Sequence, residues 1–498
     1  MKSPAFDVTK PILGAALILG AIVRFAPTLM AGFPINDGGM FLSMIRDLHT
    51  SGYVLPATTS YNFSNIPFAY PPLGFYLARL LADLGLNEIL ALRFLPALAA
   101  TCAIYGMYLL ASAITRSPET GAVSALIHAL APRSYTWLVM GGGLTRALGF
   151  CLILFVGWAV YQLFQTGSRK WLVTAILCSA LTVLSHPEAT VYAVALCALM
   201  WLFYGRTRAS AIHAVLVAAG TVLLCAPWWG TVLAHAGLEP FRSVLNTGLQ
   251  GASPAATYWR AIYPNDSILP VLSILFVAAL GWGLWKKQYF LLLWTVMPVI
   301  VEPRSALNVV VFPLSILLAG LLLDLKLYFQ SEGVAGMRNS MLGFFVLSLY
   351  LFSESYLFSR QLVNVSLTQA DRNTMMWIRG HTMVDSRFVL LTGVAGPELD
   401  AFQEWFPALA ERKSMTTFQG TEWTLGPQFL PWLRELRSLQ TCTTAVCVQT
   451  WVNKNQVRFD YIVVKKSDRT AELMAALKSD ARYEIIYEDE AAVTFAPQ

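Results

Sequence analysis

GGGLTRALGFCLILFVGWAVYQLFQ, residues 141–165, is the stretch that decides the fold class. After the leading glycines its only charged side chain is Arg146, and most of the other residues are apolar. A helix with ~20 apolar residues is long enough to cross the ~30 Å hydrocarbon core of a bilayer. Because a charged group is costly to bury in lipid, Arg146 in the first turn marks a functional-site hypothesis. The stretch therefore predicts a membrane-spanning helix with a polar site at one end.

Apolar stretches of similar character recur through the first three-quarters of the 498-residue chain. Hydrophobic residues make up 56% of the chain and charged residues only 13%, whereas soluble domains carry ~25% charged residues. The first stretch follows two lysines but has no clear cleavage site, so it is interpreted as a retained anchor rather than a signal peptide. We predict a mainly α, polytopic transmembrane helix bundle of ~11 spans. The spans are 11–31, 89–114, 118–137, 143–165, 171–185, 188–204, 212–234, 269–285, 288–301, 306–323 and 341–358.

Basic residues between the spans predict which side of the membrane each loop occupies, because lysine and arginine concentrate in cytoplasmic loops. The loops assigned to the cytoplasm hold Lys2, Lys10, Arg116, Arg169, Lys170, Arg206, Arg208, Lys286, Lys287, Lys326 and Arg338. This assignment places the N-terminus in the cytoplasm. It places on the extracytoplasmic side residues 32–88, 138–142, the His186 turn, 235–268, the Glu302 turn and the C-terminal part of the chain. The net charge of +6 is modest and lies largely in these loops, so it does not indicate nucleic-acid binding.

Residues 361–498 differ in composition from the transmembrane domain, residues 1–360, and predict an extracytoplasmic soluble α/β domain. Charged residues become frequent, and strand-like runs such as FDYIVVKK, residues 459–466, alternate with helix-like runs. Cys442 and Cys447 are the only cysteines of this part. A disulfide between them is geometrically possible in an oxidising compartment, and two unpaired thiols are the alternative.

The first outer loop, residues 32–88, is long enough to have structure of its own. Residues 38–50 and 73–86 alternate apolar and polar positions at helical spacing, as helices lying in a membrane interface do. If residues 70–86 crossed the bilayer instead, the turn before Arg146 would move to the cytoplasmic side. We therefore expect two interfacial helices in this loop.

Asn36-Asp37-Gly38-Gly39 follows the first span directly. Glycine permits a tight backbone turn beside the carboxylate. Asp37 is a candidate general base for an acceptor hydroxyl, or a candidate ligand of a divalent cation. The alternative is structural, since an aspartate suits the N-cap of a helix that begins near Met40.

Residues 141–146 have the pattern of an anion-binding helix start, with exposed N–H groups followed by a guanidinium one turn inside. We expect Arg146 to meet a phosphate or a carboxylate. The alternative is that the three glycines serve only the close packing of membrane helices.

His186-Pro187-Glu188 lies between two spans on the same predicted side. Pro187 suits the first turn of the following helix. A histidine and a glutamate two residues apart can share a metal ion or position a substrate hydroxyl. The alternatives are a hydrogen-bonded structural histidine and a glutamate that merely favours the helix N-terminus.

Glu302-Pro303-Arg304 is a second charged turn between two spans. We expect Arg304 to bind a phosphate from the side opposite Arg146, because a planar guanidinium suits phosphate recognition. The alternative is an internal ion pair between Glu302 and Arg304.

At these motifs the chain resembles the GT-C glycosyltransferases, integral membrane enzymes that take a sugar from a polyprenyl phosphate or diphosphate carrier. The shared features are an acidic residue after the first helix, a surface loop with YPPLGFYLA (residues 70–78), many spans and an outer soluble C-terminal domain. The strings EWFPALAERKSM, residues 404–415, and GTEW, residues 420–423, also resemble prokaryotic membrane proteins of this kind. The family includes protein O-mannosyltransferases, aminoarabinose transferases and oligosaccharyltransferases. No WWDYG string occurs, which argues against an oligosaccharyltransferase.

The resemblance implies an inverting membrane glycosyltransferase that uses a polyprenyl-phosphate-linked sugar and a hydroxyl of a glycan, lipid or protein acceptor. It implies that Asp37 is the catalytic carboxylate. Many relatives carry two adjacent acidic residues where this chain has Asn36-Asp37, so metal use is open; Asp37, His186 and Glu188 would be the candidate ligands of Mg²⁺ or Mn²⁺. The candidate substrate-binding residues are Tyr70, Arg146, His186, Glu188, Glu302 and Arg304.

Two other classes of protein remain open. One is a transporter or flippase for polyprenyl-linked lipids, and the other is a non-catalytic lipid-binding membrane subunit. Transporters more often have broken helices or inverted repeats, whereas this chain has no visible repeat and its charges lie at the outer ends of the spans. Release of polyprenyl phosphate from a labelled donor would separate these classes.

Overall fold

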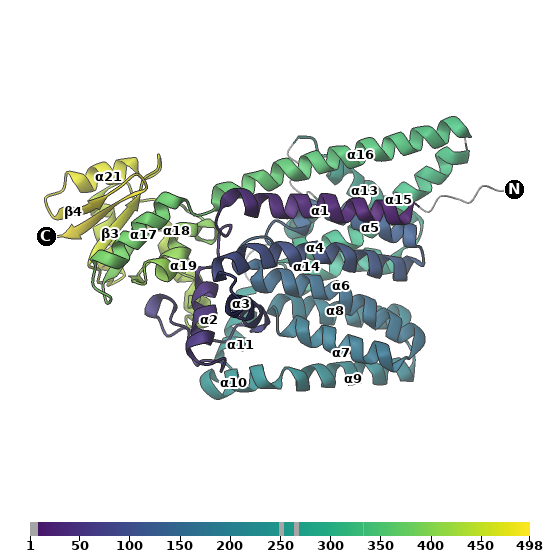
Figure 1. Cartoon of the computed structure of the whole chain (residues 1–498), viewed down its shortest axis with the longest axis horizontal. Coiled ribbons are helices and arrows are strands. Elements are labelled where there is room, and N and C mark those ends of the chain that lie inside the picture. Colours follow the sequence, from purple (N-terminus) through teal and green to yellow (C-terminus); the bar gives the residue numbers. More distant parts are fainter. Residues whose placement is uncertain (1–7, 249–252, 263–267, 332) are drawn as a thin grey trace.

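The computed structural model describes residues 8–248, 253–262, 268–331 and 333–498. Long helices run side by side as a bundle, and a smaller domain with the C-terminus packs against one end of it (Figure 1). We call this the domain end of the bundle, and the opposite end the far end. Lys2 of the predicted cytoplasmic loops, and residues 249–252 and 263–267 of the predicted outer loop 235–268, lie outside the described residues.

Every predicted span contains a helix, but the α-helix in 118–137 ends at Leu130, and 212–234 is divided between two helices that are bent by 56°. In the part of the chain that the structure describes, six helices are long and apolar enough to cross a membrane, or seven if the bent pair is one span, whereas Val271–Trp285 and Tyr289–Val301 are shorter. The chain is thus a multi-pass membrane protein, and ~11 spans stays a prediction. The bundle helices are α1 Thr9–Ala31, α4 Glu88–Thr115, α5 Pro118–Leu130, α6 Gly143–Thr166, α7 Arg169–Val183, α8 Pro187–Tyr204, α9 Arg208–Leu224, α10 Ala226–Ala236, α13 Val271–Trp285, α14 Tyr289–Val301, α15 Ala306–Ser331 and α16 Val334–Gln361.

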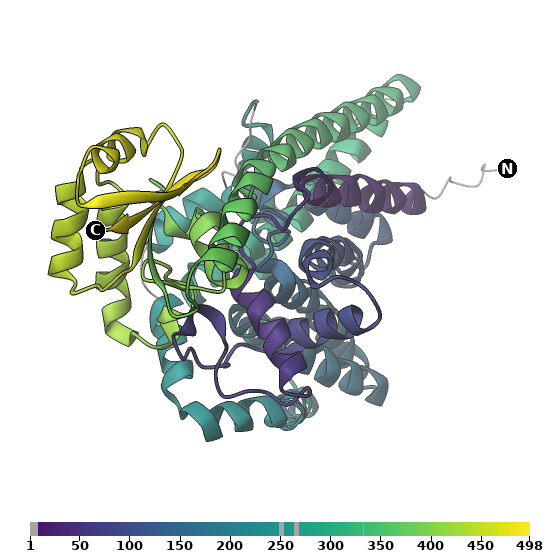
Figure 2. The ribbon, with the colours of Figure 1, turned by 60° about the vertical axis from the view of Figure 1, so that its left-hand side comes forward.

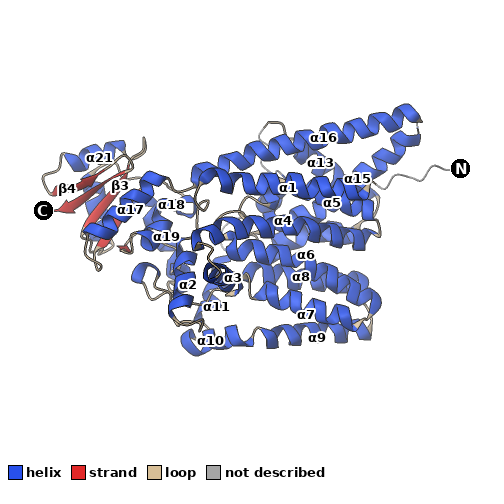
Figure 3. Cartoon of the chain, in the orientation of Figure 1, coloured by secondary structure: helices blue, strands red, loops and turns tan. Residues whose placement is uncertain are grey.

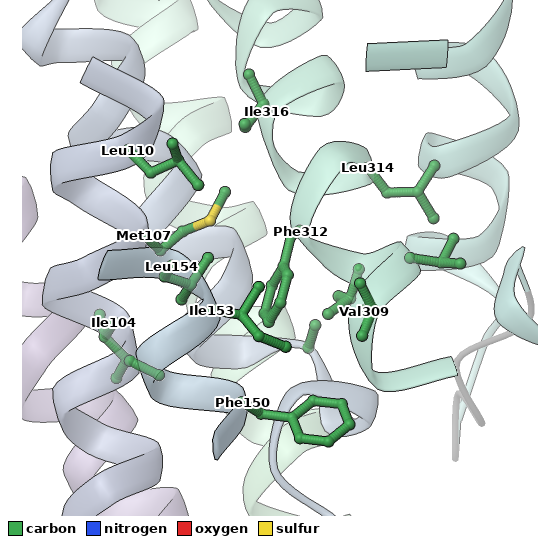
Figure 4. Close-up of a cluster of buried hydrophobic side chains, with 14 of the residues drawn as sticks. Ile104, Met107, Leu110, Phe150, Ile153, Leu154, Val309, Phe312, Leu314 and Ile316 are labelled. Carbon is green, nitrogen blue, oxygen red and sulfur yellow. The ribbon is translucent and has the colours of Figure 1, made fainter. Parts of the chain in front are cut away.

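The stretch quoted first forms α6, and it lies in the middle of the bundle. It packs against α4, and its side chains share one buried apolar cluster with those of α4 and α15 (Figure 4). Such packing excludes lipid from this part of the bundle and holds the start of α6 in one place. The labelled core residues are Ile104, Met107, Leu110, Phe150, Ile153, Leu154, Val309, Phe312, Leu314 and Ile316.

Arg24 is fully buried in α1, where a charge needs hydrogen-bond partners. Its guanidinium donates to the carbonyl of Ala129 at 2.7 Å and to the hydroxyl of Ser134 at 2.8 Å. Ala129 belongs to the last turn of α5, whose carbonyls have no partner within the helix. Arg24 therefore caps α5 and ties it to α1.

The two helices expected in the first outer loop are present, as α2 Gly39–Thr50 and α3 Leu73–Asp83. Both run across the bundle axis at the domain end, unlike the bundle helices (Figure 1). Leu73 N–H donates to the carbonyl of Leu184 at 2.8 Å, which joins the start of α3 to the end of α7. Two further helices, α11 Glu239–Gly248 and α12 Pro254–Ile262, follow α10.

Strands occur, within the described residues, only in the C-terminal domain (Figure 3). The sheet order is β2-β1-β3-β5-β4; β1 pairs in parallel with β2 and β3, and β5 pairs antiparallel to β3 and β4. Buried apolar runs such as that of β3 form its core. The strands are β1 Arg387–Leu391, β2 Lys413–Ser414, β3 Tyr461–Lys465, β4 Tyr483–Glu488 and β5 Ala492–Pro497, and the helices are α17 Gln369–His381, α18 Ala401–Leu409, α19 Phe429–Leu439, α20 Ala445–Lys454 and α21 Ala471–Lys478.

Of the two alternatives for the cysteines of this domain, the structure has the disulfide. Cys442 and Cys447 are bonded, with Cα atoms 5.6 Å apart. The domain rests on the first outer loop and the end of α16 (Figure 2). This contact matters for function because it brings C-terminal side chains over the charged turns of the bundle.

Candidate functional site

Asp37 lies against the start of α6. Its Oδ1 accepts a hydrogen bond from Gly142 N–H at 2.8 Å, and Arg146 Nη2 lies 3.7 Å from its Oδ2. The glycines make this approach feasible: a Cβ on Gly141 would lie 1.8 Å from the Asp37 carbonyl oxygen, and one on Gly142 would lie 2.2 Å from Asp37 Oδ2. The anion at this helix start is therefore the carboxylate of Asp37, one of the two partners expected for Arg146.

The alternative that Asp37 caps the helix beginning near Met40 is wrong. The N-cap of α2 is Gly38, which has no side chain that could cap the helix. The carboxylate of Asp37 makes no hydrogen bond to the first N–H groups of α2 either. The carboxylate of Glu404 in the C-terminal domain does so instead, accepting from Gly39 N–H at 2.8 Å and from Met40 N–H at 3.1 Å. Asp37 is thereby left free to face Arg146.

Glu404 and its neighbour Trp405 dock the C-terminal domain onto this turn. Trp405 Nε1 donates to the carbonyl of Asn36 at 2.8 Å. A Cβ on Gly38, whose φ is +137°, would lie 2.8 Å from the Trp405 ring. Burial, with the nearby charge of Asp37, raises the pKa of Glu404 to about 8. The string 404–415, noted in the sequence for its resemblance, thus begins with residues that hold the candidate catalytic loop.

Trp137 as well as Asp37 holds the guanidinium of Arg146 in place. Its Nη1 donates to the carbonyl of Trp137 at 2.8 Å, and its guanidinium carbon lies 5.8 Å from the centre of the Trp137 ring. The ion-pair distance of 3.7 Å is longer than a hydrogen bond. The guanidinium therefore keeps hydrogen-bonding capacity for a ligand.

The His186 and Glu302 turns meet each other. Pro187 begins α8 as predicted, which places Glu188 in the first turn. Ser305 donates its hydroxyl to Glu188 Oε2, and Arg304 Nε lies 3.7 Å from Glu188 Oε1. The charge of Glu188 raises the pKa of Arg304. Arg304 therefore pairs with a carboxylate of another turn.

The contacts of Glu302 lie within its own turn and with α8. Its carboxylate accepts the backbone N–H of Arg304 at 3.0 Å, and its carbonyl accepts the hydroxyl of Tyr192. Among the described residues the guanidinium of Arg304 makes its ion pair with Glu188, so the alternative of an internal Glu302–Arg304 ion pair is wrong. Glu302 thus stabilises the backbone of the turn. It is not among the described residues that line the cavity formed by the other charged turns.

Five of the predicted residues surround one cavity of about 280 Å³. The ring of Tyr70 lies 6.1 Å from that of His186, between centres. His186 is buried, and its Nδ1 has no hydrogen-bond partner among the described residues. The five are Tyr70, Arg146, His186, Glu188 and Arg304. Asp37 is not among the described lining residues, but its carboxylate lies 3.7 Å from the lining residue Arg146.

The sequence reasoning missed six cavity residues: Trp137, Ser305, Asn308, Glu398, Glu422 and Trp423. The ring of Trp423 lies 5.7 Å from that of Tyr70. Glu422 and Trp423 belong to the GTEW string, whose resemblance was visible but carried no assigned role. No local pattern could have placed them here, because they come from a separate domain.

A metal site is not assembled from the expected residues. Among the described residues no three His, Cys, Asp or Glu side chains are grouped so that they could hold a metal ion. Asp37 lies with Arg146, and Glu188 with Arg304, so each carboxylate already faces a cation of the protein. These residues therefore do not fit a metal ion as they are arranged here.

An apolar groove of about 690 Å³ runs between α6, α7, α8 and α9. It includes Thr182 and Thr190 near the His186 turn and extends to Phe164 and Trp201. Its lining is almost entirely hydrocarbon, which suits an extended isoprenoid or acyl chain better than a polar ligand.

A helix bundle with a charged cavity at its domain end, covered by a small α/β domain, is the GT-C fold of integral membrane glycosyltransferases, and solved structures match it over almost the whole chain. The crystal structure of ArnT from Cupriavidus metallidurans bound to undecaprenyl phosphate is 16% identical, with 99% of this chain and 98% of that chain covered and a TM-score of 0.50. ArnT in the apo state matches with 16% identity, the same coverage and a TM-score of 0.53. The cryo-EM structure of the arabinofuranosyltransferase AftD from Mycobacteria is 15% identical, with 100% of this chain and 42% of that chain covered and a TM-score of 0.53.

Sequence comparison adds one local match. Residues 69–230 match the family described as dolichyl-phosphate-mannose-protein mannosyltransferase. No curated protein matches the sequence. The predicted fold class and the resemblance to GT-C glycosyltransferases are confirmed by these findings.

Proposed function

We propose that this chain is an inverting membrane glycosyltransferase that transfers a sugar from a polyprenyl-phosphate carrier to an acceptor hydroxyl on the extracytoplasmic side. The observation that carries the proposal is the meeting of Arg146 and Arg304, from separate turns, in one cavity of about 280 Å³. Two guanidinium groups suit a phosphate that gains charge as it leaves the sugar. The undecaprenyl phosphate bound in the ArnT structure of the same fold supports this ligand class.

Asp37 is the proposed general base. Its Oδ1 is occupied by Gly142 N–H, and its Oδ2 faces Arg146 at a distance that leaves room for a further contact. The acceptor oxygen attacks the anomeric carbon and gives its proton to Asp37, while the carbon–oxygen bond to the phosphate breaks. The electron pair leaves with the phosphate, whose charge Arg146 and Arg304 stabilise.

His186, Glu188 and Tyr70 are proposed to orient the sugar or the acceptor. Glu188 is held by Ser305 and Arg304, so it can place a hydroxyl with little loss of freedom. The apolar groove between α6 and α9 is proposed to hold the prenyl chain, because its end lies near the His186 turn.

The proposed site implies a domain division and an orientation. Residues 1–360 would be the catalytic membrane domain with its outer loop 32–88, and residues 361–498 the extracytoplasmic domain. The turns that join α4 to α5, α6 to α7 and α8 to α9 lie at the far end of the bundle (Figure 1). These turns hold basic residues, which favours the far end as the cytoplasmic one.

The test is turnover of the purified, reconstituted protein with a polyprenyl-phosphate donor that carries a labelled sugar. The wild-type chain should release polyprenyl phosphate and label an acceptor. Asp37→Asn should lower turnover by ~10²-fold or more, the usual scale for lost proton transfer, while donor binding is kept. Asp385→Asn, at an exposed position of the C-terminal domain, is the matched control.

Donor movement across the membrane without sugar release would instead identify a flippase. Donor binding with neither movement nor release would identify a lipid-binding subunit. An Asp37→Asn variant that is less stable but fully active would limit Asp37 to a structural role at the start of α6.

A further inference from the structure

The segment Gly420–Trp423 carries two C-terminal side chains into a cavity that otherwise belongs mainly to the bundle. Gly420 has a φ of +83°, and a Cβ there would lie 2.5 Å from the side chain of Ile66 in the first outer loop. Ser243 of α11 donates its hydroxyl to the carbonyl of Glu422. The segment is therefore fastened on two sides, and Glu422 and Trp423 line the cavity.

Glu422 differs from the other carboxylates of the cavity in having a buried oxygen that contacts neither a hydrogen-bond donor nor an arginine in the described residues. Glu188 is engaged by Ser305 and Arg304, and Glu398 lies 3.7 Å from Arg437. The Oε2 atom of Glu422 is buried and has no hydrogen-bond partner among the described residues. A buried acceptor without a donor is costly and rare, so a missing donor from a ligand is the simplest explanation.

Trp423 adds an apolar face beside this acceptor. Its ring lies 5.7 Å from that of Tyr70, so two aromatic rings form one wall of the cavity. Sugars present apolar C–H faces and hydroxyl donors at the ring edge, which match an aromatic wall beside a carboxylate. A cavity of about 280 Å³ is also too small for an isoprenoid chain and suits a single sugar ring.

We propose that Glu422 and Trp423 form the subsite for the transferred sugar, with Glu422 Oε2 accepting one of its hydroxyl groups. The inference rests on the proposed function and deepens it, since the C-terminal domain would then select the sugar while the bundle holds the phosphate. Glu422 is a positioning residue in this arrangement and takes no proton. Burial raises its pKa, and the positive charge of Arg304 opposes that effect.

The test compares binding of two probes to the full chain in detergent: bare polyprenyl phosphate, and polyprenyl phosphate that carries mannose, glucose or arabinose. The wild-type chain should bind at least one sugar-bearing probe more tightly than the bare phosphate. Glu422→Gln should reduce that preference by about ten- to a hundredfold, the scale of a lost hydrogen bond to a charged group. It should not weaken binding of the bare phosphate, because it removes a negative charge near Arg304.

Glu422→Asp keeps the negative charge but shortens the side chain by one methylene group. It should reduce the preference for the sugar-bearing probe less than Glu422→Gln does. Glu484→Gln, at an exposed position of β4, is the matched control and should bind both probes as the wild-type chain does. Thermal unfolding measured on each variant reports whether it folds.

Equal loss of both probes in Glu422→Gln would overturn the subsite, because it would mean that Glu422 only supports Arg304. An unchanged preference would overturn it as well, and so would a wild-type chain with no preference for any sugar-bearing probe. These results differ from failure of the proposed function, in which sugar-bearing probes bind but no sugar is transferred.

Discussion

Two arginine–carboxylate pairs organise the site at the scale of single residues. Arg146 lies 3.7 Å from Asp37, and Arg304 lies 3.7 Å from Glu188. These distances give Coulomb attraction without the two close hydrogen bonds of a bidentate pair. Arg304 is also 63% exposed at its side chain, so its donors are available to a ligand. Each pair thus holds a guanidinium in place and still leaves it able to bind a phosphate.

Replacement by lysine tests this interpretation at both arginines. Lysine keeps the charge but loses the planar fork, so it is a poor replacement at a phosphate site. Arg146→Lys and Arg304→Lys should each weaken binding of polyprenyl phosphate by about 1.5–3 kcal/mol, or one to two orders of magnitude in affinity. The measurement is a titration of the purified variants with polyprenyl phosphate.

Arg482→Lys serves as the control for this prediction, because Arg482 is exposed and pairs with Asp480 in the C-terminal domain. Normal binding by both cavity variants would leave the proposed phosphate site without support.

At the scale of elements, the start of α6 shows why a helix terminus can be read in two ways. Its three glycines have the pattern of an anion site, and they are also needed for close packing, because Gly141 N–H donates to the carbonyl of Ile35 at 2.9 Å. The loop of residues 35–38 lies so close that no side chain fits between it and α6. The glycines therefore serve close packing and also expose an N–H group to an anion, which here is the carboxylate of Asp37.

Gly142→Ala should damage the site without breaking the helix. The added Cβ would lie 2.2 Å from Asp37 Oδ2, so the carboxylate must move away from Arg146. Overpacking of this kind costs ~1–3 kcal/mol, and we expect a lower melting temperature together with at least ~10-fold slower sugar transfer. Both are measured on the purified variant.

Gly14→Ala in α1 is the control, since an added Cβ there meets no atom within 4 Å. Unchanged activity in Gly142→Ala would show that the position of Asp37 is not critical.

At the scale of the whole molecule, the C-terminal domain completes the site. Glu404 holds the start of α2, Trp405 packs on Gly38, and Glu422 with Trp423 enters the cavity. Tyr61 also donates its hydroxyl to the carbonyl of Glu404 at 2.6 Å. Because these contacts converge on the turn that carries Asp37, domain docking and site geometry are coupled.

The raised pKa of Glu404 makes this docking pH dependent. Since its folded pKa of about 8 lies above the ordinary value of 4.5, its stabilising contribution is full below pH 4.5 and is lost as pH rises toward 8. We expect the free energy of unfolding to fall across this window by up to about 1.4 kcal/mol per pH unit from this group. Glu404→Gln should flatten the slope.

The measurement is the melting temperature in detergent from pH 5 to pH 9. Glu490→Gln, at an exposed position, should keep the wild-type slope. If the melting temperature of Glu404→Gln depended on pH as steeply as that of the wild-type chain, other groups would be responsible for the pH dependence.

Orientation in the membrane is a further prediction at this scale. If the basic turns of the far end are cytoplasmic, a cysteine at exposed Ser253 or Ser479 should react with an impermeant thiol reagent in intact cells. A cysteine at Thr166, at the far end of α6, should react only after the membrane is opened. The unmodified chain measures the background from its own cysteines, and the opposite pattern would reverse the proposed orientation.

The sequence by itself determined the class of fold, because apolar periodicity and length are local properties that each span carries alone. It also identified Arg146, His186, Glu188 and Arg304 as candidates, because ionisable groups at the ends of apolar spans are conspicuous wherever they lie. Tyr70 became a candidate through the resemblance of the string of residues 70–78. These residues do surround one cavity, while their proposed roles remain to be tested.

Only the tertiary structure decided which groups meet. Arg304 pairs with Glu188 rather than with its sequence neighbour Glu302, and α2 receives its capping carboxylate from Glu404, far along the chain. Glu422 reaches the cavity from another domain. Partner choice among charges depends on distance and burial in three dimensions, and neither quantity is encoded in the spacing of residues along the chain.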